Sequence, residues 1–248
     1  MKRWFLCTAL LLLGSLPTLG MALTAEEIVQ KADEVRSPAG QSQDFVQTIT
    51  ITTMTAGKPT ETNGYDVFVK GFDKVFVQFT VPPRNIGRSL LVLDRDLWIY
   101  LPSAGKPVRI PLSQRLVGQV ANGDIARVNY AGDYHAELVR DETVNGQACS
   151  VLKLTAKTKE VTYASILYWV AKDSFRPVQA EFYTLSGKLL KTGHWDNDQM
   201  VHGGLRPTRL TLVDGIKTEA RSILDYSNWR LQDLPEKMFN KNYMKQLD

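Results

Sequence analysis

The chain of 248 residues has few of the residues that build catalytic or metal sites. It contains two cysteines, Cys7 and Cys149, and three histidines, His135, His194 and His202. No histidine has a cysteine or carboxylate at the spacing of a zinc site, and the chain has no Gly-x-Ser-x-Gly elbow, phosphate-binding glycine loop or dinucleotide fingerprint. We therefore predict no enzyme, no cofactor and no metal.

Neither positive nor negative charge predominates in the chain. Thirty Lys and Arg face 26 Asp and Glu, a formal net charge of +4, and the basic residues are spread singly among acids. This pattern argues against a nucleic-acid partner, which requires clustered basic residues. With 44% hydrophobic and 23% charged residues, the composition is that of a globular protein and excludes a disordered chain.

One apolar run occurs at the N-terminus and is too short to cross a bilayer core of about 30 Å. Lys2 and Arg3 precede the run at 4–13, and Gly20-Met21-Ala22 provides the small residues of a cleavage site. We predict a signal peptide at 1–22, cleaved near Ala22-Leu23, and a single mature domain at 23–248 in the periplasm. The mature chain then keeps only Cys149, which we expect to be a buried, inert thiol.

The mature domain begins with helical signals. Thr24-Ala25-Glu26-Glu27 has the form of a capping box, in which Thr24 and Glu27 satisfy early backbone N–H groups. Ile28, Ala32 and Val35 follow at helical spacing, so we predict an amphipathic helix at 25–36. A second, short helix is predicted where Asp233-Leu234-Pro235-Glu236 combines a cap, an early proline and an acid.

Between these helices the apolar period is two, which indicates antiparallel strands with one face in water. Turn residues such as Asn145-Gly146 and Asp214-Gly215 separate the runs at hairpin spacing. We predict a mainly β fold with a strongly curved antiparallel sheet of about eleven strands, near 45–52, 65–70, 74–79, 88–93, 97–101, 147–156, 162–171, 177–184, 188–196, 207–213 and 216–226.

The segment 103–134 lacks this alternation. Long segments of this kind are uncommon in compact domains, and they are either functional or mobile surface excursions. The sequence favours neither alternative.

The apolar face of the sheet is larger than two short helices can cover. Its side chains could fill a tight core, or they could line a cavity between the sheet and its helical cover. The candidate cavity residues are Ile49, Ile51, Val67, Val77, Phe79, Leu91, Trp98, Tyr100, Tyr168, Phe182, Leu210 and Leu212.

Three stretches together resemble the outer-membrane lipoprotein-sorting family, the relatives of the periplasmic carrier LolA. Residues 79–91 resemble its F-x-x-P-x-R-x-x-G-x-x-L-L element, 96–102 with 108–111 its D-x-W-x-Y-L-P hairpin, and 122–125 its G-S-D-F element. The resemblance implies an unclosed antiparallel β-barrel covered by helices, with an apolar cavity for acyl chains. It also implies an inner-membrane transporter as donor and an acceptor in the outer membrane. After Asp124 the chain departs from the family pattern, losing an aromatic and two acids.

The leading hypothesis is a monomeric carrier of lipidated protein or lipid, without covalent chemistry. The alternatives are a lipid-sensing regulatory module similar to RseB, an accessory protein of an inner-membrane lipid exporter, or an enzyme of unrecognised type. The helix at 25–36, with Ile28, Ala32 and Val35, is the candidate lid. Arg84 and Arg88 flank a turn and are either tethers for the lid or loop, or solvated turn charges.

Overall fold

The computed structural model describes residues 23–36, 43–71, 73–127 and 129–245. The predicted signal peptide at 1–22 lies outside this part of the chain. The described residues form helices α1 (Ala25–Arg36), α2 (Asn122–Ala126) and α3 (Tyr130–Asp133) and four 3₁₀ turns, η1 (Pro83–Asn85), η2 (Pro102–Ala104), η3 (Glu236–Met238) and η4 (Tyr243–Lys245). Their strands are β1 (Phe45–Met54), β2 (Glu61–Lys70), β3 (Lys74–Val81), β4 (Ser89–Leu93), β5 (Asp96–Tyr100), β6 (Val108–Ile110), β7 (Arg115–Val117), β8 (Val120–Ala121), β9 (Tyr134–Val144), β10 (Gln147–Ala156), β11 (Ser165–Ala171), β12 (Pro177–Tyr183), β13 (Leu189–Val201), β14 (Gly204–Asp214) and β15 (Arg221–Leu231).

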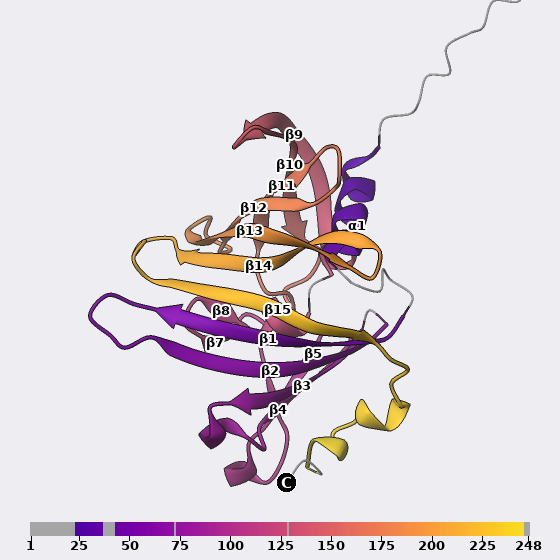
Figure 1. Ribbon diagram of the computed structural model, residues 1–248, viewed down its shortest axis with the longest axis vertical. Helices are drawn as coiled ribbons and strands as arrows, with labels where there is room; N and C mark the ends of the chain where they lie inside the picture. Colours follow the sequence, from indigo (N-terminus) through magenta and orange to yellow (C-terminus); the bar gives the residue numbers. More distant parts are fainter. Residues whose placement is uncertain (1–22, 37–42, 72, 128, 246–248) are drawn as a thin grey trace, which may run out of the picture.

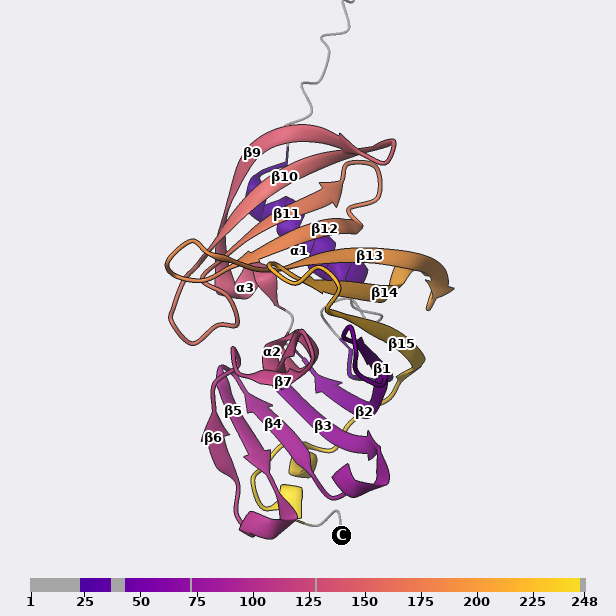
Figure 2. The same cartoon turned by 90° about the vertical axis from the view of Figure 1, so that its left-hand side faces the viewer.

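Thirteen strands form one antiparallel sheet in the order β6-β5-β4-β3-β2-β1-β15-β14-β13-β12-β11-β10-β9. The first and last strands pair in its middle, where Ile49 of β1 lies opposite Tyr226 of β15. The sheet therefore has two arms, β1–β6 and β9–β15, each a meander (Figures 1 and 2). Its edge strands β6 and β9 are not paired with each other, so the sheet is open. The predicted mainly β, unclosed antiparallel fold is confirmed.

The connection between the two edges contains β7, β8, α2 and α3. In Figure 2, β7 and α2 lie between the two arms, and α3 lies against the upper one. Helix α2 is buried throughout and packs near β3 and β4, whereas α1 packs against α3, β9, β11 and β14. The segment at 103–134 is thus not structureless: residues 120–127 are buried inside the curved sheet, whereas 103–111 are mostly exposed.

Helix α1 begins as the sequence predicts. Thr24 Oγ1 accepts a hydrogen bond from the Glu27 backbone N–H (3.2 Å), and Glu27 Oε2 accepts one from the Thr24 N–H (2.7 Å). Ile28, Val29 and Ala32 are buried against the concave side of the sheet. The amphipathic pattern therefore places the helix on that face.

The sheet is apolar on both faces over β2–β5. On the convex face, the C-terminal segment with η3 and η4 contributes Leu234, Met238, Phe239 and Met244 to a second core. Leu91, Tyr100 and Trp98 belong to this second core, and their prediction as cavity residues beside Ile49 is wrong. In β4 (Ser89–Leu93), apolar and polar residues do not alternate, because other segments of the chain cover both faces of the sheet there. The sequence therefore does not show which face points to the main core. The predicted second helix is instead the 3₁₀ turn η3.

Strand β9 was absent from the prediction although it has 11 residues. It is an edge strand, and most of its side chains are exposed, including Leu138 and Val139. Only Tyr134 and Ala136, at its start, are buried, so the apolar alternation does not continue along the strand and its sequence has no clear periodic signal.

Candidate functional site

A cavity of about 150 Å³ lies on the concave side of the sheet, lined by α1, residues 123–127, Asn129 and Tyr130, and strands of both arms. Its apolar wall includes Ile49, Phe182 and Leu210, three of the predicted cavity residues. The remaining lining residues are Asp33, Arg36, Phe45, Gln47, Val69, Gly71, Val75, Gly123, Asp124, Ile125, Ala126, Arg127, Asn129, Tyr130, Thr162, Tyr163, Trp195, Pro207, Tyr226 and Trp229.

The other predicted cavity residues on this side pack around the cavity without lining it. They belong to the same buried cluster, and they are Ile51, Val67, Val77, Phe79, Tyr168 and Leu212. The concave side is therefore part core and part cavity. Both alternatives that the sequence left open, a filled core and a lined cavity, therefore occur on the same face of the sheet, in neighbouring residues.

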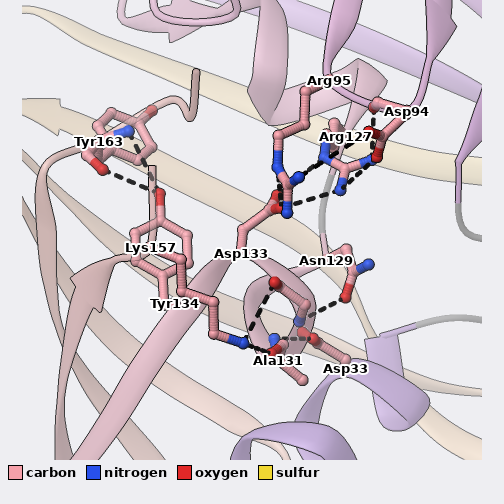
Figure 3. Close-up of polar contacts among 11 residues, drawn as sticks. Asp33, Asp94, Arg95, Arg127, Asn129, Ala131, Asp133, Tyr134, Lys157 and Tyr163 are labelled. Atoms are coloured by element: carbon pink, nitrogen blue, oxygen red, sulfur yellow. Dashed lines mark hydrogen bonds and ion pairs between the residues drawn. The ribbon is translucent and has the colours of Figure 1, made fainter. Parts of the chain in front are cut away.

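The C-terminal end of α1 is attached at two places. Arg206 of β14 donates from Nη1 to the carbonyl oxygens of Glu34 (2.8 Å) and Val35 (2.7 Å), which a helix end otherwise leaves without partners. Asp33 Oδ2 accepts the backbone N–H of Ala131 in α3 (2.8 Å), as Figure 3 shows. Of the predicted lid residues, Ile28 and Ala32 are buried and Val35 is half-buried.

Beside this attachment, Arg36 forms an ion pair with Asp33 and lies over the ring of Tyr130, with the guanidinium carbon 4.1 Å from the ring centroid. The Arg36 side chain is only 10% exposed. Burial raises the pKa of the Asp33 carboxyl, although Arg36 acts in the opposite direction. Burial likewise raises the pKa of the phenols of Tyr130 and Tyr226, so both remain neutral donors at pH 7.

Helix α2 is fixed by Asp124. Its Oδ2 accepts from Lys191 Nζ of β13 (2.6 Å) and from the Ala121 backbone N–H (2.8 Å), and its Oδ1 accepts from the Tyr163 hydroxyl. Burial lowers the pKa of Lys191, and the neighbouring Asp124 opposes this shift. Gly123 approaches the loop before β11 so closely that a Cβ would lie 1.9 Å from Thr162 Oγ1, so only glycine fits there.

A second buried ion pair follows α2. Arg127 donates from Nε and Nη2 to the two carboxylate oxygens of Asp133 (both 2.9 Å) and from Nη1 to the Asp94 carbonyl (2.6 Å). Arg95 approaches the same carboxylate at 3.4 Å. Figure 3 shows both arginines converging on Asp133, which connects α3 to the β4–β5 turn.

The predicted tethers Arg84 and Arg88 do not have this role. Among the described residues, neither side chain forms a hydrogen bond or an ion pair, and Arg84 is exposed. Arg206, Arg127 and Lys191 hold the helices instead. Sequence reasoning missed them, because a single basic residue in a strand or loop does not reveal its distant partner.

Two other classes of site receive no support from the described residues. No group of three or more His, Cys, Asp or Glu among them is placed to hold a metal ion. None of their helices is long and apolar enough to cross a membrane.

The fold and sequence resemble solved structures. A LolA superfamily protein from Nitrosomonas europaea is 44% identical, with a TM-score of 0.84 over 90% of this chain and 100% of that one. A putative outer membrane lipoprotein-sorting protein domain from Vibrio parahaemolyticus is 26% identical, with a TM-score of 0.75 over 89% and 98%. A DUF1329 family protein from Desulfovibrio piger shares the fold at 22% identity, with a TM-score of 0.77 over 89% and 97%. A family model described as an uncharacterized protein matches residues 71–246, and no curated protein matches the chain.

Proposed function

Since the chain belongs to the LolA superfamily, we propose that it is a periplasmic carrier that binds the acyl chains of lipids or lipidated proteins and moves them towards the outer membrane without covalent chemistry. An inner-membrane transporter would be the donor and an outer-membrane component the acceptor. The protein would act as a monomer. The observation that carries the proposal is the cavity between the sheet and its cover, whose wall includes Ile49, Phe182 and Leu210.

The size of this cavity supports a carrier in its closed state. A cavity of about 150 Å³ suffices for one benzene molecule, whereas sites for larger ligands occupy about 300 Å³ or more. An acyl chain of a dozen carbons therefore needs more space than the 150 Å³ present. Loading requires that part of the cover moves away from the sheet, and we propose α1 as the lid.

The free energy gained when the acyl chain leaves water supplies the driving force for opening the cover. Burying a chain of a dozen methylenes gains about 10 kcal/mol at roughly 0.8 kcal/mol per CH₂. For the same reason, free acyl chains do not cross an aqueous compartment at a useful rate. A shuttle that covers the chain removes this barrier.

The experiment is native mass spectrometry of protein purified from the periplasm, together with titration of the delipidated protein with dodecanoate. Wild-type protein should carry acyl species and bind dodecanoate. Leu210→Trp places a large side chain in the cavity and should weaken binding at least tenfold, whereas Leu138→Trp on the exposed edge strand β9 should not. Absence of any acyl species and of binding, or equal behaviour of the two variants, would refute the proposal.

A further inference from the structure

One end of the cavity contains buried hydrogen-bond donors without protein partners. Among the described residues, Arg36 Nε and Trp229 Nε1 are buried and donate to no partner, and both residues line the cavity. The hydroxyl of Tyr168, whose ring lies 5.9 Å from the Arg36 guanidinium carbon, is also without a partner. The other unpartnered polar side-chain atoms of the described residues belong to Ser89, Arg95, Thr158 and Trp169, none of which lines the cavity.

Buried donors of this kind require an explanation, because each one costs about 1–3 kcal/mol when it is left unsatisfied. The contacts of Arg36 use only some of the N–H donors of its guanidinium. Asp33 takes one of its terminal nitrogens, and the ring of Tyr130 covers one face of the guanidinium. Stacking leaves the N–H groups at the guanidinium edge available for an acceptor.

Hydrogen bonds place the backbone of Arg36 and Trp229 near the start of β14, because Arg206 Nη1 donates to the Glu34 and Val35 carbonyls and His202 Nε2 lies 3.3 Å from the Trp229 carbonyl oxygen. Pro207, which lines the cavity with Arg36 and Trp229, pairs with Asp198 of β13, whereas Phe182 pairs with Lys191 of the same strand. At about 3.3 Å per residue, the two positions are separated by about 23 Å along β13. Pro207 and Phe182 therefore mark two separate ends of the cavity lining, with Trp229 and the C-terminal end of α1 at the Pro207 end.

From this arrangement we infer that the Arg36–Trp229 end is a headgroup site for an amphiphile whose acyl chain ends in oxygen acceptors, a carboxylate or an ester, with its tail directed towards Phe182. The inference rests on the proposed carrier function and specifies its ligand. An ammonium headgroup has donors only and would leave Arg36 and Trp229 unsatisfied. The site therefore discriminates by headgroup, which a purely apolar cavity would not do.

The test is calorimetric titration of the delipidated protein with three ligands of equal tail length: dodecanoate, glycerol monododecanoate and dodecylamine. Dodecanoate or glycerol monododecanoate, or both, should bind at least about tenfold more tightly than dodecylamine, since a hydrogen bond to a charged group contributes roughly 1.5–3 kcal/mol. Tighter binding of dodecanoate than of the ester identifies a carboxylate site, and equal binding of the two indicates that a carbonyl is sufficient.

Variants assign the discrimination to residues. Trp229→Phe keeps the ring and removes the N–H, so it should weaken the two oxygen ligands about fivefold and leave dodecylamine unchanged. Arg36→Met should abolish the headgroup preference, and Arg140→Met provides the matched control, because Arg140 stacks on Trp169 in a separate cluster. Since Arg36→Met leaves Asp33 unpaired and can destabilise the fold, Trp229→Phe is the decisive variant.

Two results would overturn the headgroup site. Equal affinity of wild-type protein for all three ligands would reject it while preserving the carrier proposal, as would an equal effect of Trp229→Phe on all three. Binding of none of them would reject the carrier proposal itself, and the headgroup site with it.

Discussion

Replacing Lys191 with methionine should be among the most destabilising single changes in the chain. Lys191 and Asp124 are only 5% and 6% exposed, and their Nζ and Oδ2 atoms lie 2.6 Å apart. Methionine matches the length of the lysine side chain but leaves the Asp124 carboxylate buried without a cation, which costs about 3–5 kcal/mol. The Gln119 carbonyl also loses the Lys191 hydrogen bond of 2.6 Å. A typical domain has only about 5–15 kcal/mol of unfolding free energy, so this loss is large.

Urea unfolding followed by circular dichroism measures the effect as a lower midpoint at an unchanged slope. Lys153→Met is the matched control, because Lys153 is an exposed residue of β10, and it should change the unfolding free energy by less than about 0.5 kcal/mol. Hydrogen exchange should also accelerate in residues 119–127 of the Lys191→Met protein, where Asp124 holds α2. If the two variants differ by less than about 1 kcal/mol, the pair does not fix α2 as we describe.

Two further predictions concern parts of the chain outside the cavity. Burial raises the pKa of the Cys149 thiol, so iodoacetamide should modify it slowly at pH 8 in the native protein and rapidly in urea, and rapid native labelling would contradict its burial. Although burial opposes ionisation of Asp44, hydrogen bonds from Lys70 and from the Leu234 N–H lower its pKa. A carboxyl whose folded pKa is depressed contributes stability above its unfolded pKa, near 4, and loses this contribution as the pH falls through the folded value. Protection factors for hydrogen exchange in residues 232–245 should therefore fall below about pH 4 in wild-type protein and already be low at pH 6 in Asp44→Asn, and pH-independent protection of the wild-type protein would contradict the role of Asp44.

The sequence predicts those features of the fold that depend on neighbouring residues. The Thr24–Glu27 capping box and the spacing of Ile28 and Ala32 are local, and they predict α1 and its buried face correctly. The alternation in the middle of β1 is equally local, because Ile49 and Ile51 are buried while Thr48, Thr50 and Thr52 are only half-buried. Strand β4 carries no such information, since its residues Ser89–Val92 are all buried between two covers.

The polar part of the site depends on contacts between distant residues, and the sequence does not reveal it. Asp33 and Arg36 are three apart on a helix, which is the usual spacing of a solvent-exposed ion pair. Only the packing of α1 against α3 and β14 buries them beside the cavity. Lys191 and Asp124 are likewise ordinary residues in sequence, and the strand register brings them together across 67 positions.

The free-energy costs of exposing α1 or α2 indicate which part of the cover moves when cargo enters. Displacing α1 exposes Ile28, Val29 and Ala32, which costs about 5 kcal/mol at roughly 1.5–3 kcal/mol for each large side chain. It also breaks the hydrogen bonds that Arg206 and Asp33 form at the C-terminal end of the helix. Displacing the segment around α2 exposes the buried Leu112, Val120 and Ile125 at a similar cost, and it also separates two buried ion pairs from their hydrogen-bond partners. An acyl chain gains about 10 kcal/mol on burial. That gain is comparable with the cost of displacing α1 and smaller than the cost of displacing α1 and α2 together. Because the segment around α2 would also lose two buried ion pairs, we propose that α2 remains the fixed wall of the cavity and that α1 opens.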